Sequence, residues 1–145
     1  MIYVASSWKN IFQQDIVKLL EKEGFEVYDF KNPTIGNTGF SWNEIDENWK
    51  HWKPYEFREN LNNSLAIEGF NLDFEAMQKS DICILVLPAG RSAHTEAGWM
   101  KGAGKKVYVY MPVKQEPELM YKIYDAICLS CEGLISVIKD NDMEI

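Results

Sequence analysis

The sequence of 145 residues has no long hydrophobic run, few cysteines and no excess of positive charge. No apolar stretch approaches the roughly 20 residues that a membrane-spanning helix needs. The first five residues lack the charged start and long apolar middle of a signal peptide. The net charge of −7 argues against a nucleic-acid polymer as partner, because binding a phosphate backbone requires a basic face. A nucleoside or a mononucleotide stays open, since one arginine can bind one phosphate.

The sequence also has few cysteines. Cys83, Cys128 and Cys131 are odd in number, which suits a reducing compartment better than a disulfide framework, so we expect a cytoplasmic protein. Cys128 and Cys131 have a Cys-x-x-Cys spacing, but no second pair and no clustered histidines accompany them. The spacing therefore favours two small structural residues over a zinc site. Glycine-rich nucleotide-binding motifs are absent too, and we expect neither a metal nor another cofactor.

Short apolar segments alternate with helical periodicity along the chain. Strands are predicted at Ile2–Ala5, Phe25–Tyr28, Ile82–Leu87, Val107–Met111 and Ala126–Leu129. Helices are predicted at Gln13–Glu23, Asn71–Lys79, Ala93–Ala103, Glu118–Tyr124 and Glu132–Lys139. The alternation predicts a single α/β domain over residues 1–145, with a doubly wound, flavodoxin-like sheet of five parallel strands in the order 2-1-3-4-5.

An aromatic-rich insertion, Lys31–Asn63, follows the second predicted strand. We expect a long loop with short helices around Asn43–Trp49 and Pro54–Asn60. Long connections inside compact domains are usually lids or binding loops. Its aromatic residues, Trp42 among them, either stack on a flat ligand or fill a small core beneath the loop, and the sequence leaves both readings open.

Glu96 is the sharpest candidate for chemistry. It follows the third predicted strand and a short polar loop, at the place where the next helix is expected to begin. Ligands of open α/β sheets bind at the carboxyl ends of the strands, and the positive end of a helix favours an ionised carboxylate. An ionised, positioned carboxylate can act as a nucleophile.

Two loops are expected to face the same crevice as Glu96, because strands one and three are neighbours in the predicted sheet. In the first loop, Ser6, Ser7 and Asn10 offer hydroxyl and amide groups for the hydroxyls of a sugar, or they cap the following helix. In the second loop, Gly90, Arg91 and Ser92 precede a helix and suit an anion such as a 5′-phosphate; a solvated arginine is the alternative. His94 either assists proton transfer or is simply exposed.

A second carboxylate, Asp73, is expected near the start of the predicted helix Asn71–Lys79, where it either caps that helix or reaches the crevice. Asp81 is expected to be structural at the entry to the third strand. Paired carboxylates such as Asp73 and Glu96 suit glycosidic chemistry, in which retaining enzymes place the two roughly 5 Å apart.

The segments Ile2–Ala5 and Glu96–Val107, together with Asp73 and Asp81, resemble the nucleoside 2-deoxyribosyltransferase superfamily, which includes the 2′-deoxynucleoside 5′-phosphate N-hydrolases. The resemblance covers about half of the chain. It implies that Glu96 attacks the anomeric carbon and forms a glycosyl ester, that Asp73 binds the sugar hydroxyls, and that Tyr3 or Ser6 contacts the sugar. Transferases of the family often carry an aspartate six residues before the nucleophile, and here that position is Gly90.

The sequence therefore predicts an enzyme that cleaves or transfers the N-glycosidic bond of a nucleoside or nucleoside monophosphate. Related proteins often complete their site across a dimer interface, so a homodimer or higher homo-oligomer is one expectation. Two other readings compete with catalysis. One is a non-catalytic nucleotide-binding module, and the other is a scaffold that binds a protein through Trp42 and Trp49.

Overall fold

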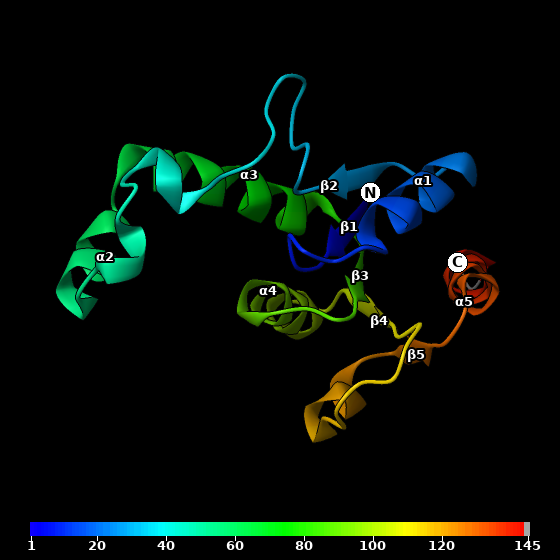
Figure 1. Cartoon of the computed structure of the whole chain (residues 1–145). Helices are drawn as coiled ribbons and strands as arrows, with labels where there is room; N and C mark the ends of the chain where they lie inside the picture. Colours follow the sequence, from blue (N-terminus) through cyan, green and yellow to red (C-terminus); the bar gives the residue numbers. More distant parts are fainter. Residues whose placement is uncertain (144–145) are drawn as a thin grey trace. The chain divides into compact units, whose positions relative to one another are not determined.

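The computed structural model describes residues 1–143 of the chain. Its centre is a parallel sheet of five strands in the order β2-β1-β3-β4-β5 (Figure 1). The strands are β1 (Ile2–Ala5), β2 (Val27–Asp29), β3 (Ile82–Val86), β4 (Lys106–Tyr110) and β5 (Ala126–Cys128). The predicted fold class and strand order are confirmed, with strand boundaries shifted by one or two residues.

Each of the three helices that cover this sheet follows a strand. α1 (Gln13–Lys22) and α5 (Cys131–Met143) lie on one face, and α4 (Arg91–Gly102) lies on the other (Figure 1). The segment predicted as a helix before β5 is the 3-10 helix η3 (Leu119–Ile123). None of the helices among residues 1–143 is long and apolar enough to cross a membrane.

Alternating side chains of the central strands divide the core into two layers. Val4, Ile84 and their neighbours on one face pack with α1 and α5 in a core that includes Leu20 and Leu134. The intervening residues of the strands point to the opposite face, because successive strand residues alternate. Tyr3, which pairs with Cys83 in register, belongs to this second face. The face that carries Tyr3 is therefore the face that α4 covers.

The segment Phe30–Ala76 forms a second compact unit. It contains η1 (Trp42–Glu44), η2 (Trp49–His51), α2 (Pro54–Asn60) and most of α3 (Ser64–Lys79). The predicted helix Pro54–Asn60 is confirmed as α2, whereas the helix predicted around Asn43–Trp49 was wrong, since two 3-10 helices, η1 and η2, lie at the two ends of that range with turns between them.

The predicted start of α3 at Asn71 was wrong, since the helix begins at Ser64. Gly69 lies inside it, where an added Cβ would come 2.9 Å from the Cβ of Phe40, so this helical glycine permits a close aromatic contact.

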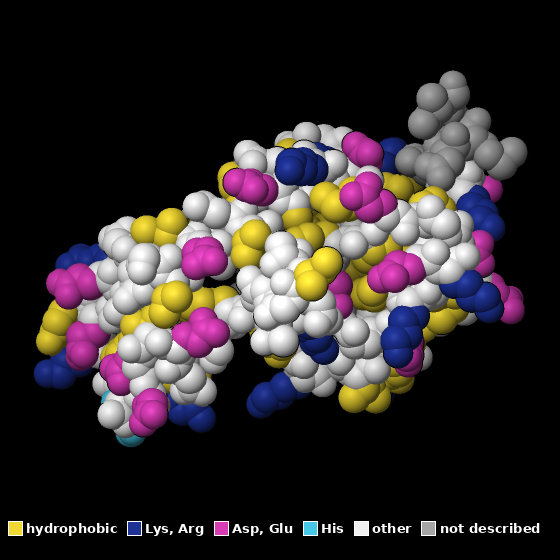
Figure 2. All heavy atoms as spheres, turned by 90° about the horizontal axis from the view of Figure 1, so that it is seen from above, with side chains coloured by type: hydrophobic (Ala, Val, Ile, Leu, Met, Phe, Trp, Pro, Cys, Tyr) yellow, Lys and Arg dark blue, Asp and Glu magenta, His cyan; other side chains and the backbone are white. Residues whose placement is uncertain are grey.

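Charged side chains of both signs are interspersed on the surface seen in Figure 2, with hydrophobic side chains between them. On this face, neither sign gathers into a broad patch. This agrees with the absence of a basic excess in the sequence, where 22 acidic residues exceed 15 basic ones.

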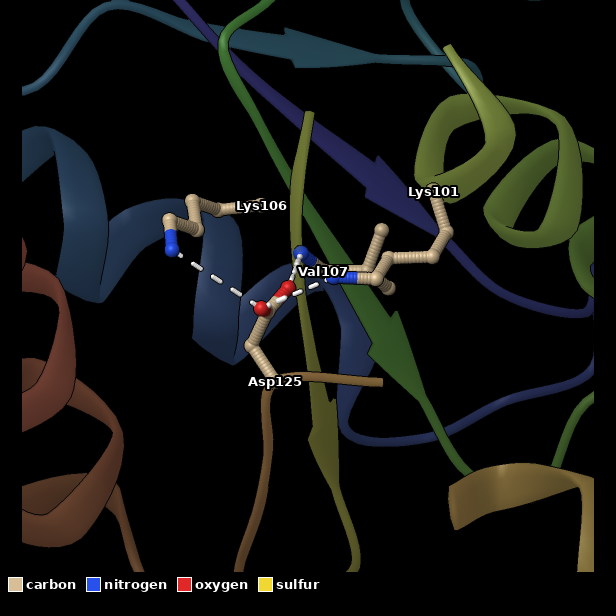
Figure 3. A network of polar contacts seen from close by, with 4 residues as sticks. All are labelled: Lys101, Lys106, Val107 and Asp125. Carbon is tan, nitrogen blue, oxygen red and sulfur yellow. Dashed lines mark hydrogen bonds and ion pairs between the residues drawn. The ribbon is translucent and has the colours of Figure 1, made fainter. Parts of the chain in front are cut away.

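Asp125 anchors the segment that leads into β5 (Figure 3). Its carboxylate accepts hydrogen bonds from the backbone N–H of Val107 (2.8 Å) and from Lys101 Nζ (2.9 Å), and Lys106 Nζ lies 3.8 Å away. Burial acts to raise the pKa of the Asp125 carboxyl group, but the hydrogen bonds and the two lysine charges outweigh it and lower the pKa. The ionised form of Asp125 is therefore favoured in the folded state.

We expect the stabilisation from Asp125 to depend on pH. A carboxyl pKa that is lower in the folded chain than in the unfolded chain stabilises the fold above the unfolded value, and this contribution is lost as the pH falls through the folded value. Asp125→Asn should thus lower the free energy of unfolding at pH 7, and the difference from wild type should shrink below about pH 4. Urea denaturation at pH 7 and pH 3 measures both differences. Lys101→Met should lose part of the same pH dependence, and a difference that stays constant with pH would contradict the assignment.

Candidate active site

The hydroxyl group of Tyr3 donates a hydrogen bond to Oε2 of Glu96. Tyr3 lies in the middle of β1 and is fully buried, whereas Glu96 is half-buried on α4. The contact joins residues that are 93 positions apart in the chain. The structure thus places the predicted nucleophile beside one of the residues predicted to contact the sugar.

Glu96 is not at the start of its helix, and this prediction was wrong. α4 begins at Arg91, so Glu96 lies in the second turn. The backbone field of a helix falls off within its first turn, and a direct hydrogen bond from Tyr3 acts on the carboxylate instead. Gly90 has extended backbone geometry as the N-cap, which lets the helix begin directly after the loop.

On the side that faces the sheet, the residues next to Glu96 are buried. Cys83 lies fully buried on β3, next to Tyr3 in register. Burial raises the pKa of the Cys83 thiol, and the negative charge of Glu96 raises it further. Cys83 is therefore a neutral thiol beneath the carboxylate, and it provides an apolar floor for the site.

The loop after β1 is fastened to the loop after β3. Ser6 Oγ donates to the backbone O of Val86 (2.7 Å), and Asn10 Nδ2 donates to the same O (3.2 Å) and to the O of Pro88 (2.9 Å). Asn10 Oδ1 accepts from the N–H groups of Phe12 (2.6 Å) and Gln13 (2.9 Å) at the start of α1. The helix-capping alternative holds for Asn10, and the hydroxyl hydrogen of Ser6 is engaged within the protein.

The outer part of the same loop faces solvent. Ser7 is half-buried, and its Oγ accepts from the N–H of Lys9 (3.3 Å). Trp8, which sequence reasoning did not select, has 50% of its surface exposed at the carboxyl end of β1. The available signal was its position, an aromatic residue directly after two serines at the end of a strand.

The loop between β3 and α4 presents Gly90, Arg91 and Ser92, all three exposed. The backbone O of Arg91 accepts from Thr95 Oγ1 (2.8 Å) within α4. The predicted anion-binding residues thus occupy the first turn of a helix of 12 residues. Free N–H groups of a first helical turn can bind an anion.

His94 contacts two other residues through its ring nitrogens. Its Nδ1 lies 2.7 Å from the backbone O of Gly90, and its Nε2 lies 2.8 Å from the hydroxyl O of Tyr121. The His94 ring is half-buried and nearly parallel to that of Tyr121, at an interplanar angle of 14°. His94 is therefore not simply exposed, and its role in proton transfer stays a prediction. Tyr121 is a further residue that sequence reasoning did not single out.

Asp73 does not cap α3, because this helix begins at Ser64 and Asp73 lies near its third turn. The prediction that placed it at a helix start was wrong. Asp73 is half-buried and belongs to the unit Phe30–Ala76, whereas Glu96 belongs to the other unit. The pairing of the two carboxylates stays a prediction.

Trp42 lies within an aromatic cluster of the unit Phe30–Ala76. Its ring makes edge-on contacts with Phe40 (centroids 4.8 Å apart) and Trp52 (5.7 Å), and a tilted contact with Phe57 (5.9 Å). The indole N–H of Trp52 donates to Asp46, and that of Trp49 donates to Asn43. These contacts favour the small core beneath the loop, since edge-to-face pairs stabilise a packed cluster.

Comparisons with known proteins place the fold. No protein-family model matches the sequence, and no curated protein matches it. Among solved structures, the chain is similar to a 2-deoxyribosyltransferase from the psychrotolerant bacterium Bacillus psychrosaccharolyticus, with a TM-score of 0.57 and 20% identity over 92% of this chain and 88% of that one. It also matches the Clostridium botulinum CMP N-glycosidase BcmB, with a TM-score of 0.49 and 15% identity over 95% of this chain and 97% of that one.

The contribution of the Asn10 hydrogen bonds to stability can be measured. Asn10→Ala removes all four hydrogen bonds of a buried amide and leaves two carbonyl groups and two N–H groups without it, so we expect a loss of about 1–3 kcal/mol in the free energy of unfolding. Urea denaturation measures the loss. Asn62→Ala, at an exposed position, is the matched control and should change stability by less than about 0.5 kcal/mol. Equal effects of the two substitutions would show that the bridge contributes nothing.

Proposed function

We propose that this chain cleaves the N-glycosidic bond of a nucleoside or nucleoside monophosphate through a covalent glycosyl ester on Glu96. Membership of the nucleoside 2-deoxyribosyltransferase superfamily is part of this proposal. The likeness of fold to a 2-deoxyribosyltransferase supports it, as do the sequence segments around Tyr3 and Glu96.

The contact between Tyr3 and Glu96 is the observation that carries the proposal. A carboxylate that accepts a hydrogen bond from a buried phenol is held in one orientation, and its ionised form is favoured by that bond. Oε2 of Glu96 accepts this hydrogen bond, which fixes the plane of the carboxylate relative to β1. The buried floor at Cys83 keeps water away from one side of the carboxylate, which strengthens its electrostatic interaction with a positive centre.

The proposed reaction has two steps. In the first, a carboxylate oxygen of Glu96 forms a bond to the anomeric carbon while the bond from that carbon to the base nitrogen breaks, and the base departs with the electron pair. In the second, water or another base attacks the same carbon, the ester bond breaks, and the Glu96 carboxylate is restored. Positive charge develops on the sugar in both transition states, and the negative charge of Glu96 stabilises it.

Further side chains receive roles within this proposal. Asp73 binds the sugar hydroxyls, as the family resemblance implies. Ser7 serves the sugar better than Ser6, because the Ser6 hydroxyl hydrogen is donated to Val86. Gly90, Arg91 and Ser92 bind a 5′-phosphate in the first turn of α4. The contacts of Trp42 favour a structural role over stacking on the base.

A screen of nucleosides and their monophosphates for base release tests the function. Glu96→Gln keeps the size of the side chain and a hydrogen-bond acceptor for Tyr3 but removes the nucleophilic charge, so we expect turnover to fall by about a thousandfold or more. Intact-mass measurement of quenched wild-type enzyme should detect the sugar ester, which Glu96→Gln lacks. Glu132→Gln, an exposed carboxylate on α5, is the matched control and should retain full turnover.

The outcomes separate the competing functions. Base release that needs a second base identifies a transferase, and release in its absence identifies a hydrolase. Equal turnover by wild type and Glu96→Gln would refute the covalent mechanism. Tight nucleotide binding without base release over long incubation would identify a binding module instead.

A further inference from the structure

The segment that connects β4 to β5, residues 111–125, contacts α4 near both ends of this helix. Near the amino end, Tyr121 of η3 meets His94, and their polar atoms are 2.8 Å apart. At the carboxyl end, Asp125 accepts a hydrogen bond of 2.9 Å from Lys101 (Figure 3). The connection, which we call the brace (residues 111–125), therefore spans the length of the helix that carries Glu96.

Both contacts with the brace are made by side chains on the same side of α4. His94 and Lys101 are seven residues, or about two helical turns, apart, so their side chains project from the same face. Glu96 follows His94 by two residues, which places it about 200° around the helix axis. This direction leads to Tyr3 on β1. The brace thus holds the helix from the side opposite to the contact between Glu96 and Tyr3.

The hydrogen atoms of the His94 ring are fixed by its neighbours. The backbone O of Gly90 can only accept, so Nδ1 of His94 donates to it, in addition to the backbone N–H of His94 (3.2 Å). In a neutral ring, Nε2 then accepts from the hydroxyl group of Tyr121. Both ring nitrogens are engaged, and the hydroxyl of Tyr121 fastens the first turn of α4 to the brace.

The brace itself is anchored to the core. Tyr121 packs against Tyr124 with ring centroids 6.0 Å apart. Tyr124 is half-buried, and burial raises the pKa of its hydroxyl group. The backbone N–H of Asp125 donates to the O of Val107 on β4 (2.9 Å). A shift of Tyr121 relative to the sheet therefore disturbs the contacts of Tyr124 and Asp125 as well.

We infer that the hydrogen bond between Tyr121 and His94 is a positioning element for Glu96: it sets the rotation of α4 about its own axis so that the carboxylate meets Tyr3. This role differs from the predicted role of His94 in proton transfer. The kinetic part of the inference rests on the proposed function, whereas its structural part does not.

A double-mutant cycle tests the positioning role. Tyr121→Phe removes the hydroxyl alone, and His94→Asn keeps a donor near Gly90 but loses the acceptor for Tyr121. Each variant should lower kcat for base release about fivefold with KM within about twofold of wild type. The double variant should be no worse than either single variant, because both remove the same bond. Tyr55→Phe, an exposed tyrosine of α2, is the matched control and should leave kcat unchanged.

NMR measurements without substrate test the positioning role independently of the proposed function. The ¹⁵N resonances of His94 should show a proton on Nδ1 in the neutral ring, with the exposed His51 as internal reference. The ¹³C resonance of the Glu96 carboxyl carbon should shift in Tyr121→Phe and His94→Asn, by the same amount in the double variant, and not in Tyr55→Phe.

Three results would overturn the inference: a proton on Nε2 of neutral His94, an unchanged Glu96 resonance, or losses that add in the double variant. A raised KM at constant kcat would instead assign His94 to substrate binding, and this fourth result would also overturn the inference. Wild-type enzyme that releases no base, with the NMR results as expected, would refute the proposed function and leave the positioning role standing.

Discussion

The close packing of α4 on β1 and β3 is the constraint on which the candidate site depends. The helix turns Ala93 and Ala97 toward the sheet, both of them almost fully buried. Small residues four apart on a helix let its backbone approach a neighbouring layer closely. At this separation, a side chain of the length of glutamate can reach a tyrosine in the middle of a strand. A bulkier residue at position 93 or 97 would lift the helix and separate Glu96 from Tyr3.

Much of this architecture was predictable from the sequence, because local patterns determine it. The apolar run Ile82–Leu87 indicated a strand covered on both faces, and the helix between the first two strands indicated parallel pairing. Long-range contacts were not predictable in the same way. The polar loop before Glu96 gave no sign that α4 begins at Arg91, and nothing local to His94 indicated Tyr121, which lies 27 residues further on.

For the polar residues at the carboxyl ends of the strands, too, the local position was predictable and the contact partner was not. Their positions in loops were evident, but a hydroxyl or amide group in a loop suits a ligand and a backbone carbonyl equally well. Ser6 and Asn10 bind backbone within the fold. The aromatic residues of Phe30–Ala76 were ambiguous for a similar reason, since a tryptophan has faces for a ligand or for its neighbours, and Trp42 has two close aromatic neighbours in edge-on contact.

The side-chain amide of Asn10 links two loops so that they move together. Through a single side chain, the turn after β1 and the turn after β3 share hydrogen bonds across 76 and 78 positions of sequence. A molecule that presses on either turn displaces the other, and α1, whose first N–H groups bind the same amide, moves with both. The hydrogen bonds of one amide thereby connect the two turns to the first turn of a helix on the face of the sheet opposite to α4.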